Sequence, residues 1–545
     1  MSSAAAQLAR YWHTIRHLRP VQIYGRLWFR ATRPRPRLAP PPPERRPVDA
    51  WVTPARRRPS QVGPASFRFL NETRALGPAG WDDPAVPLLW RYNLHYFDDL
   101  NAEDAAQRTA WHQAFIERWI AENPPASGNS GWEPYPTSLR IVNWVKWARA
   151  GNLLTPEAVH SLAVQARWLS QRLEHHLLGN HLFANAKALI FVGSYFDGPE
   201  AERWRQRGLG LLVREIPEQI LPDGGHFELS TMYQALALED MLDLVNLSRS
   251  TGFPLPATWE QRIAAMRAWL ATLSHPDGEI AFFNDAAIGV APSPAELDRY
   301  AADLGFTPLQ EFATGCHDLA PSGYLRLSGD DAVALLDVAR IGPDYLPGHA
   351  HADTLSFELS VRGERCVVNS GTSVYGLGSE RLRQRGTGSH NSVVVDGADS
   401  SEVWGGFRVA RRGRPYGLTI DRAPDGWIVA CAHDGYHRLP GHPSHHRTWR
   451  FSNHSLAVAD KVTGPPRSAL AMFHFHPDLT PLPSGNAGFG QLQRRGVTAL
   501  RWQVGRGRAS LEPSTWHPEF GLAVASHRLV VELVDNASDV AFFWE

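Results

Sequence analysis

Cysteine is scarce in this 545-residue chain, and no long apolar run occurs in it. Cys316, Cys366 and Cys431 are too few and too scattered for a disulfide framework or a thiolate metal site, so we expect them to be small buried side chains. No segment approaches membrane-spanning length, and the N-terminus lacks a basic start followed by an uninterrupted apolar stretch. We therefore expect a soluble protein without a recognisable signal peptide and without integral membrane association, in either periplasm or cytoplasm.

Net charge is missing as well. The chain has 55 basic and 55 acidic residues, so no overall field selects nucleic acid or an anionic membrane, and we expect no nucleic-acid partner. An anionic polymer must instead be met by a local group of basic residues. All the basic residues except Lys146, Lys187 and Lys461 are arginines, which can bind a carboxylate through two parallel hydrogen bonds.

The composition, 43% hydrophobic and 20% charged, is that of a globular chain long enough for two or three domains. From about residue 85 to 315, apolar residues recur three and four positions apart, which predicts helices. The predicted helices cover 111–121, 138–151, 156–176, 181–196, 200–219, 231–250 and 258–273. From about 321, short alternating runs predict strands, for example at 324–327, 332–339, 355–361, 366–369, 392–395 and 427–430. The fold class is therefore α+β and multidomain, helical first and β-sandwich-like second.

The first 48 residues differ from the rest. Residues 10–30 carry apolar and aromatic residues among arginines, which predicts an amphipathic helix interrupted at Pro20. A membrane surface or a partner could cover its apolar face, but packing against the chain's own body is favoured. The Pro- and Arg-rich stretch that follows predicts an extended tether. We accordingly divide the chain into segments 1–32, 33–48, 49–320 and 321–545.

The motif Gly-His-Ala-His-Ala-Asp, residues 348–353, places His349 and His351 two positions apart before a strand-like run. In extended backbone both rings would point to one side and so share a site. That arrangement suits a metal, a proton shuttle, or one ring for each task. The alternative is a pair of polar residues in a surface turn.

A second polar cluster lies far upstream, at residues 179–187 and 223–233. Asn180 is placed to cap a helix, and His181 then lies one turn before Asn185 on the same helix face. Ser230 can cap the next helix and put Tyr233 in its first turn, where the helix dipole favours a phenolate and pulls the phenol pKa towards neutrality. A capped helix with a satisfied histidine, and a core tyrosine with a bonded hydroxyl, are the structural alternatives.

Three segments together resemble the heparinase II/III family of polysaccharide lyases. They are Asn-His-Leu-Phe-Ala-Asn-Ala-Lys-Ala-Leu from Asn180, Asp-Gly-Gly-His-Phe-Glu-Leu-Ser from Asp223 through Tyr233, and Gly-His-Ala-His-Ala-Asp-Thr-Leu-Ser-Phe-Glu from Gly348. The resemblance runs from about residue 90 to the end. It implies an N-terminal incomplete (α/α) toroid, a following antiparallel β-sandwich domain, and an active site in the cleft between them. It also implies an anionic polysaccharide substrate, cleaved at a uronic acid by β-elimination to leave an unsaturated non-reducing end.

That reaction requires the uronate carboxylate to be neutralised before the C5 proton leaves, then a base for that proton and an acid for the departing O4. By the resemblance, Asn180 and His181 neutralise the carboxylate. Tyr233 matches a tyrosine that can serve as both base and acid when the two groups lie on one face of the sugar. His349 matches a histidine that can take the proton from the opposite face. Which of the two is the base stays open.

Other residues are expected to hold the substrate. They are Trp132, Tyr135, Arg140, Glu228, Arg383 and Arg385. Aromatic rings can stack on sugars while Arg140 meets a carboxylate, and core packing is the alternative for the tryptophans. Arg381, Arg383 and Arg385 alternate, so an extended backbone would present them as a basic strip, although a solvated loop is the alternative for at least one.

The resemblance further implies a structural zinc held by His351, His390 and an acidic residue, and no organic cofactor. The acidic position is Asn369 here, and a neutral amide is a much poorer zinc ligand than a carboxylate. We therefore expect less than one zinc per chain. A second departure is Ala184, where some members of the family place a glutamate; we expect it to alter the carboxylate-neutralising shell.

Three other functions are alternatives to a polysaccharide lyase. A two-metal hydrolase of the metallo-β-lactamase type needs a histidine where Thr354 stands and alternating β and α elements. An (α/α) glycoside hydrolase would use paired carboxylates drawn from Asp223, Glu228 and Asp285 but leaves the two histidines unexplained. A non-catalytic polysaccharide-binding protein is the third. The identity of the polysaccharide, endo or exo cleavage and the oligomeric state stay open.

Overall fold

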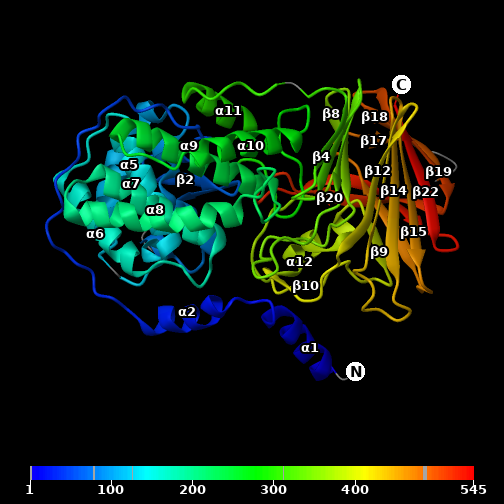
Figure 1. Ribbon diagram of the computed structural model, residues 1–545, viewed down its shortest axis with the longest axis horizontal. Coiled ribbons are helices and arrows are strands. Elements are labelled where there is room, and N and C mark those ends of the chain that lie inside the picture. Colours follow the sequence, from blue (N-terminus) through cyan, green and yellow to red (C-terminus); the bar gives the residue numbers. More distant parts are fainter. Residues whose placement is uncertain (1–2, 78–79, 126, 311, 483–487, 545) are drawn as a thin grey trace.

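The computed structural model describes residues 3–77, 80–125, 127–310, 312–482 and 488–544. Helices fill the first part of the chain and antiparallel sheets the second, and the two parts lie side by side (Figure 1). This arrangement confirms the predicted incomplete (α/α) toroid followed by a β-sandwich domain. The last toroid helix ends at Asp303 and the first strand of the β domain begins at Gly315, six residues before the predicted domain start at 321.

Each of the seven helices predicted between 111 and 273 is present. The toroid helices are α3 Leu88–Tyr96, α4 Thr109–Glu122, α5 Pro134–Arg149, α6 Pro156–Gln171, α7 Gly179–Tyr195, α8 Pro199–Gln219, α9 Thr231–Thr251, α10 Thr258–Thr272 and α11 Pro294–Asp303. A small sheet of β1 Gln61–Gly63, β2 Ser66–Phe69 and β3 Glu72–Ala75 precedes them. Among the described residues, none of these helices combines the length and the apolar composition needed to cross a bilayer.

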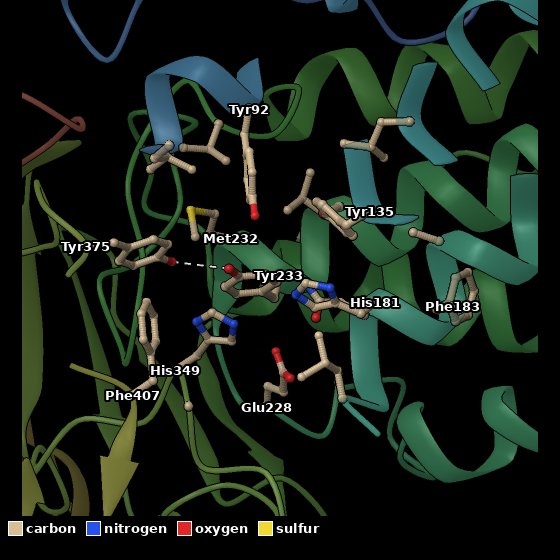
Figure 2. Close-up of a pocket in the computed structure, with 18 of the residues that line it drawn as sticks. Tyr92, Tyr135, His181, Phe183, Glu228, Met232, Tyr233, His349, Tyr375 and Phe407 are labelled. Atoms are coloured by element: carbon tan, nitrogen blue, oxygen red, sulfur yellow. Dashed lines mark hydrogen bonds between the residues drawn. The ribbon is translucent and has the colours of Figure 1, made fainter. Parts of the chain in front are cut away.

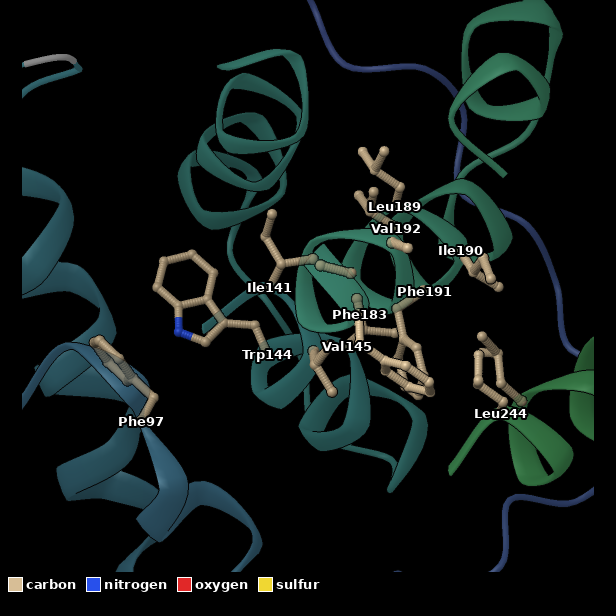
Figure 3. Close-up of a cluster of buried hydrophobic side chains, with 14 of the residues drawn as sticks. Phe97, Ile141, Trp144, Val145, Phe183, Leu189, Ile190, Phe191, Val192 and Leu244 are labelled. Atoms are coloured by element: carbon tan, nitrogen blue, oxygen red, sulfur yellow. The ribbon is translucent and has the colours of Figure 1, made fainter. Parts of the chain in front are cut away.

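Helix α7 is the centre of the toroid. From Leu182 to Tyr195 every residue is buried, and its side chains meet those of α5 and α9 in one core (Figure 3). Helix α8 approaches it closely, because a Cβ added at Gly193 would lie 2.6 Å from the Ala201 carbonyl oxygen and one added at Gly208 would lie 2.5 Å from that of Ala186. The buried helix therefore holds its own N-terminal residues, Asn180 and His181, in a rigid position.

The N-terminal segment forms α1 Ser3–Ile15 and α2 Pro20–Ala31, with Pro20 at the first position of the second helix as the sequence predicts. Both helices lie along one edge of the molecule (Figure 1). The Pro-rich tether then runs over the toroid, where the Arg167 guanidinium donates to the carbonyl oxygens of Ala39 and Pro40 at 2.6 and 2.9 Å.

The β domain consists of three main antiparallel sheets around one core. The strands are β4 Gly315–Leu319, β5 Tyr324–Ser328, β6 Ala332–Asp337, β7 Phe357–Val361, β8 Glu364–Val367, β9 Val393–Val395, β12 Pro415–Ala423, β13 Gly426–His433, β14 Ser444–Ser452, β15 Ser455–Thr463, β16 Ala469–His474, β17 Thr480–Pro481, β18 Phe489–Arg494, β19 Val497–Arg506, β20 Arg508–Trp516, β21 Val524–Glu532 and β22 Ala537–Phe543. Their orders are β4-β5-β6-β7-β8, β20-β21-β16-β9 and β12-β13-β14-β15-β22-β19-β18-β17. Alternate burial along β15 shows one face turned to the core.

Two long connections of the β domain reach the toroid. One joins β6 to β7 and carries His349 and His351; the other joins β8 to β9 and contains α12 Ser379–Arg385. The small ribbon of β10 Val403–Trp404 and β11 Arg408–Val409 lies nearby. The predicted extended basic strip at 381–385 is therefore wrong, because these arginines lie on a short helix and do not all project to one side.

Candidate active site

A cavity of about 1750 Å³ lies between the toroid and the loops of the β domain. Six of the residues selected from the sequence line it: Tyr135, Asn180, His181, Glu228, Tyr233 and His349. The toroid supplies the first five and the β6–β7 connection supplies His349 (Figure 2). Residues more than 160 positions apart in the chain thus meet at one site.

Asn180 and His181 occupy the first turn of α7. The expected N-cap role of Asn180 is wrong by two residues, because the helix begins at Gly179 and Leu178 stands at the cap with φ of 63°. Gly179 also has a positive φ, 53°, and a Cβ there would lie 2.4 Å from Leu346 Cδ2 and 3.2 Å from Glu228 Oε1. Glycine at this position therefore lets the loop bearing His349 approach the start of the helix.

His181 is held by a carboxylate that the sequence did not indicate. Its Nδ1 lies 3.2 Å from Glu174 Oε1, and the Asn185 amide donates to the other oxygen of Glu174 at 3.1 Å. Burial lowers the pKa of His181, but the charge and hydrogen bond of Glu174 outweigh it, so that the pKa is raised. The ring also packs on Tyr135, with ring centroids 4.6 Å apart. Glu174 thus supplies a carboxylate next to His181, although the glutamate that some family members have at position 184 is an alanine here.

Tyr233 lies in the first turn of α9 as predicted, with its backbone N–H donating to the Ser230 side chain at 3.2 Å. Its hydroxyl lies 3.2 Å from that of Tyr375 (Figure 2). The expectation that the helix dipole pulls its pKa towards neutrality is wrong. Burial raises the pKa of Tyr233 well above its ordinary value, and Tyr375, Asp285 and Glu228 add to the effect. Tyr233 is therefore a neutral phenol with a proton to donate.

His349 stands against Tyr233, with ring centroids 4.0 Å apart. Its Nδ1 lies 2.9 Å from Asp285 Oδ2, and its side chain is 16% exposed, so the ring reaches the cavity while one nitrogen is anchored. With the Nδ1 hydrogen donated to the carboxylate, Nε2 carries a free lone pair. His349 and His351 thus share the Asp285 carboxylate and lie in a loop, not in the extended backbone that the sequence predicted.

Asp285 is the centre of this arrangement, although the sequence indicated it only as a hydrolase candidate. It is fully buried and binds His349, His351 at 2.8 Å and Arg381, whose Nη2 lies 2.7 Å from Oδ2. Burial alone would raise the pKa of Asp285, but Arg381 and the two histidines hold it well below its usual range. No local sequence signal marks Asp285 or Glu174, because their partners are brought to them by folding.

Glu228 lines the same cavity, but its pKa is shifted in the opposite direction from that of Asp285. Burial, with the charge of Asp285, raises the pKa of Glu228 against the opposing effect of the histidines. Among the described side chains, none hydrogen-bonds its Oε2. A carboxylic acid with a raised pKa and a free oxygen can donate a hydrogen bond to a ligand carboxylate.

The residues expected to hold zinc are buried behind the site. His351 Nδ1 lies 3.2 Å from His390 Nε2, but Asn369 Oδ1 lies 3.2 Å from the other ring nitrogen of His390. An ion between the two facing nitrogens would leave the amide on the far side of His390. Within the described ranges, no group of three or more His, Cys, Asp or Glu side chains is placed to hold a metal. The three residues therefore do not fit a zinc site as they stand.

Four expected substrate-binding residues lie outside the cavity lining. Trp132 is 4% exposed and packs in the toroid core, which was the alternative to substrate binding given for the tryptophans. Arg140 is fully buried, where its guanidinium donates to Gln165 and to the Gly131 carbonyl at 2.9 Å. This position does not present it to a substrate.

The two remaining arginines have different surroundings. Arg383 is exposed and pairs with Glu380 on the surface of α12. Arg385 is buried and donates to the carbonyl oxygens of Ala350 and Gly406 at 2.7 and 2.8 Å. Arg385 thus holds the loop that carries His349 and His351, and neither arginine lines the cavity.

The hydrolase alternative loses most of its carboxylates. Asp223 accepts hydrogen bonds from Ser322 and does not line the cavity, and Asp285 is fully buried. Of the three candidates, Glu228 alone lines it. The helical toroid and antiparallel sheets likewise do not provide the alternating elements of the metallo-β-lactamase fold.

Two profiles of one protein family match the chain. The family profile "Heparinase II/III N-terminus" matches residues 96–300, and "Heparinase II/III-like, C-terminal" matches residues 313–545. The chain belongs to the heparinase II/III family. The two profiles together include Asn180, His181, Tyr233 and His349, while the cavity residues before position 96 lie outside both matches.

Two similar proteins carry different names. A heparin-sulfate lyase of Bacteroides stercoris is 25% identical over 456 residues, 73% of this chain and 65% of that protein. FtsZ-localized protein C of Caulobacter vibrioides is 26% identical over 357 residues, 61% of this chain and 58% of that protein. The chain thus spans about two thirds or less of these curated relatives.

A solved structure of heparinase III shares the fold, with a TM-score of 0.67 and 18% identity, over 86% of this chain and 80% of that one.

Proposed function

We propose that this protein is a polysaccharide lyase that cleaves a uronic-acid-containing polymer by β-elimination and leaves an unsaturated sugar at the new non-reducing end. The observation that carries the proposal is the convergence of Asn180, Tyr233 and His349 on one cavity. The names of the heparin-sulfate lyase relatives support it. A non-catalytic binding protein would not need a buried phenol in contact with an anchored imidazole.

The substrate carboxylate is met by Asn180, His181 and Glu228. The raised pKa of His181 favours its cationic form, and the raised pKa of Glu228 favours its neutral form, which donates a hydrogen bond. With the Asn180 amide, these groups withdraw charge from the carboxylate and stabilise the enolate-like intermediate.

His349 is the base in this proposal and Tyr233 the acid. The C5 proton passes to His349 Nε2, the electron pair of the C5–H bond forms the C4–C5 double bond, and the C4–O4 bond breaks. Tyr233 then gives its hydroxyl proton to O4. The raised pKa of Tyr233 supports this division, because a phenol that is protonated before the reaction has a proton to give to O4 and cannot take the C5 proton. Asp285 stabilises the imidazolium that forms on His349.

The toroid end of the cavity favours a polymer with few sulfate groups. Three of the basic residues that line it are already paired with carboxylates of the same cavity: Arg57 with Glu239, Lys146 with Asp243, and Lys187 with Asp240 and Asp243. Asp98 adds another carboxylate to the lining. A sulfate entering this region would meet no unpaired cation of this group and would be repelled by the acids.

The test is to incubate the purified protein with matched uronate polymers, with and without sulfate, and follow the ultraviolet absorbance of the new double bond. We expect absorbance to rise with the unsulfated polymers. Tyr233→Phe should lower turnover by about 10³-fold or more with unchanged thermal unfolding, because only the hydroxyl is lost. The exposed Tyr416→Phe is the control. Hydrolysis without absorbance, intact polymer throughout, or near-wild-type turnover of Tyr233→Phe would contradict the proposal.

A further inference from the structure

The two N-terminal helices expose large apolar side chains to solvent. Leu8 and Trp12 on α1, with Tyr24, Leu27 and Trp28 on α2, are each between 62% and 71% exposed. Ile15 and Ile23 are about half exposed. We call these seven residues the N-terminal apolar face. Such a group of exposed apolar side chains is unusual on the surface of a soluble protein. It marks a site for interaction with a protein, a membrane or a ligand.

This face is not needed to attach the helices to the rest of the chain. On α2, Ile23, Tyr24, Leu27 and Trp28 follow the spacing of one helix side. Residues on the other side make the attachment: the Gln22 amide donates to the Tyr345 carbonyl at 3.0 Å, and the Phe29 ring lies 4.4 Å from that of His176. Tyr24 and Trp28 are thus turned away from the body of the protein, whereas Ile23 and Leu27 also border the cavity.

Contacts to both domains fix the helices in this orientation. Arg19 lies over the Tyr345 ring at 3.7 Å and pairs with Glu218 of the toroid. On α1, the Trp404 indole of the β domain donates to Thr14 at 3.1 Å, and its ring meets Tyr11 edge to face. The face is therefore presented by a braced element and not by a loose tail.

The same segment is strongly basic. Residues 1–43 contain eight arginines and no aspartate or glutamate, although the whole chain has equal numbers of basic and acidic residues. Arg26 and Arg30 lie next to the apolar stripe of α2, and both are exposed. Basic residues beside exposed tryptophan, tyrosine and leucine complement a surface that is anionic at its head groups and apolar just beneath them.

We propose that the N-terminal apolar face docks the protein on an anionic lipid surface. The helices, 13 and 12 residues long, are too short to cross a bilayer and suit a position in its interface. A polysaccharide would use the arginines but would leave leucine and isoleucine side chains in water. A second copy of the chain, with no net charge, offers no match for eight arginines.

The docking also places the cleft. Ile15, Ile23, Leu27 and the two arginines Arg26 and Arg30 line the cavity as well as forming or flanking the face. A protein held by this face therefore has the rim of its cleft at the lipid surface. Polymer anchored in or lying on that surface would enter the site without diffusing from solution.

The experiment is co-sedimentation of the full-length protein with vesicles of phosphatidylglycerol and phosphatidylethanolamine, and with vesicles of phosphatidylcholine alone. We expect binding to the first kind and about ten-fold weaker binding to the second. Trp12→Ser with Trp28→Ser should weaken binding to the anionic vesicles about ten-fold or more, because two interfacial side chains are lost. Arg26→Gln with Arg30→Gln should reduce the preference for anionic lipid. Leu153→Ser with Val497→Ser, which removes two exposed apolar side chains elsewhere on the surface, is the matched control and should bind as wild type.

Three results would overturn the docking. The first is no sedimentation with either vesicle at low salt. The second is unchanged binding of the double tryptophan variant. The third is that the double tryptophan variant keeps its vesicle binding but loses another interaction of the wild type. That interaction would be a dimer seen by analytical ultracentrifugation or retention on a soluble uronate polymer. The assay measures no turnover, so its outcome is separate from that of the proposed lyase activity.

Discussion

Two buried aspartates in this protein have nearly the same partners but differ in whether a bonded histidine reaches the cavity. Asp285 binds Arg381 and two histidines at the domain boundary, and Asp460 binds Arg447 and His445 inside the β domain. The second group also contains a facing histidine pair, since His445 Nδ1 lies 3.2 Å from His433 Nε2. In each case the arginine, with the other donors, holds the pKa of the carboxyl below its usual range against the effect of burial.

What separates the two groups is access. His349 has one nitrogen on Asp285 and an edge in the cavity, while His445 is fully buried with both nitrogens occupied. An arginine, an aspartate and a histidine therefore do not make an active site by chemistry alone. They become one where folding leaves one ring nitrogen free beside a space large enough for a substrate.

The largest expected difference between the two groups is in turnover. His349→Ala should lower kcat by about 10²- to 10⁴-fold, because the base is lost, while folding is retained. His445→Ala should leave kcat per folded molecule unchanged and lower thermal stability instead. Initial rates and unfolding curves for both variants check this. Full activity of His349→Ala on every cleaved polymer would restrict the base role to Tyr233.

Next in size is an effect that the two groups should share. Asp285→Asn and Asp460→Asn each leave a buried guanidinium, of Arg381 or Arg447, without its carboxylate. We expect each to reduce the free energy of unfolding by about 3–5 kcal/mol, measured by urea denaturation. Only Asp285→Asn should also lower kcat, since His349 loses its anchor. An equal loss of kcat in both variants would contradict the prediction that only the Asp285 group affects turnover.

Acid lability should also be spread over both regions. Burial lowers the pKa of His226, beside the active site, to about 3, and lowers that of His433, in the β domain, well below 6.5. Both are neutral in the folded protein, while the unfolded chain binds protons below pH 6.5. Their contribution is thus full above pH 6.5 and is lost as the pH falls towards the folded value.

His226→Gln and His433→Gln should each flatten the fall in unfolding free energy between pH 6.5 and 5, by roughly 1–2 kcal/mol. Urea denaturation at a series of pH values measures it. The aspartates act in a separate window, below their ordinary pKa of 3.8. Identical slopes for wild type and both variants would show that other groups control the acid response.

The smallest effect concerns zinc at the paired histidines. His351 and His390 face each other at the same 3.2 Å as His433 and His445, with Asn369 beside the first pair. We expect less than one zinc per chain by elemental analysis, and no gain in Asn369→Asp, because a carboxylate there would also lie on the far side of His390 from the facing nitrogens. One tight zinc per wild-type chain would contradict the argument from Asn369.

Much of the fold could be predicted from local pattern. The helices from 111 to 273 and the change to strands near 321 follow from apolar spacing, and Ser230 caps α9 as its position before Tyr233 indicated. The segment that carries Trp132 and Arg140 resembles a cleft-lining element of the family, but both side chains lie in the core. Residue type indicates what a side chain can do, while burial depends on packing between elements.

The sequence by itself determined the order of the two domains and indicated six of the polar residues that line the cavity, because helix period, strand alternation and short motifs are local properties of the chain. Only the tertiary structure decided which carboxylates those residues would meet. Glu174 beside His181 and Asp285 beside His349 are partners across a loop and across 64 residues. The phenol pKa of Tyr233 was also decided there, since burial between two domains outweighs the dipole of its own helix.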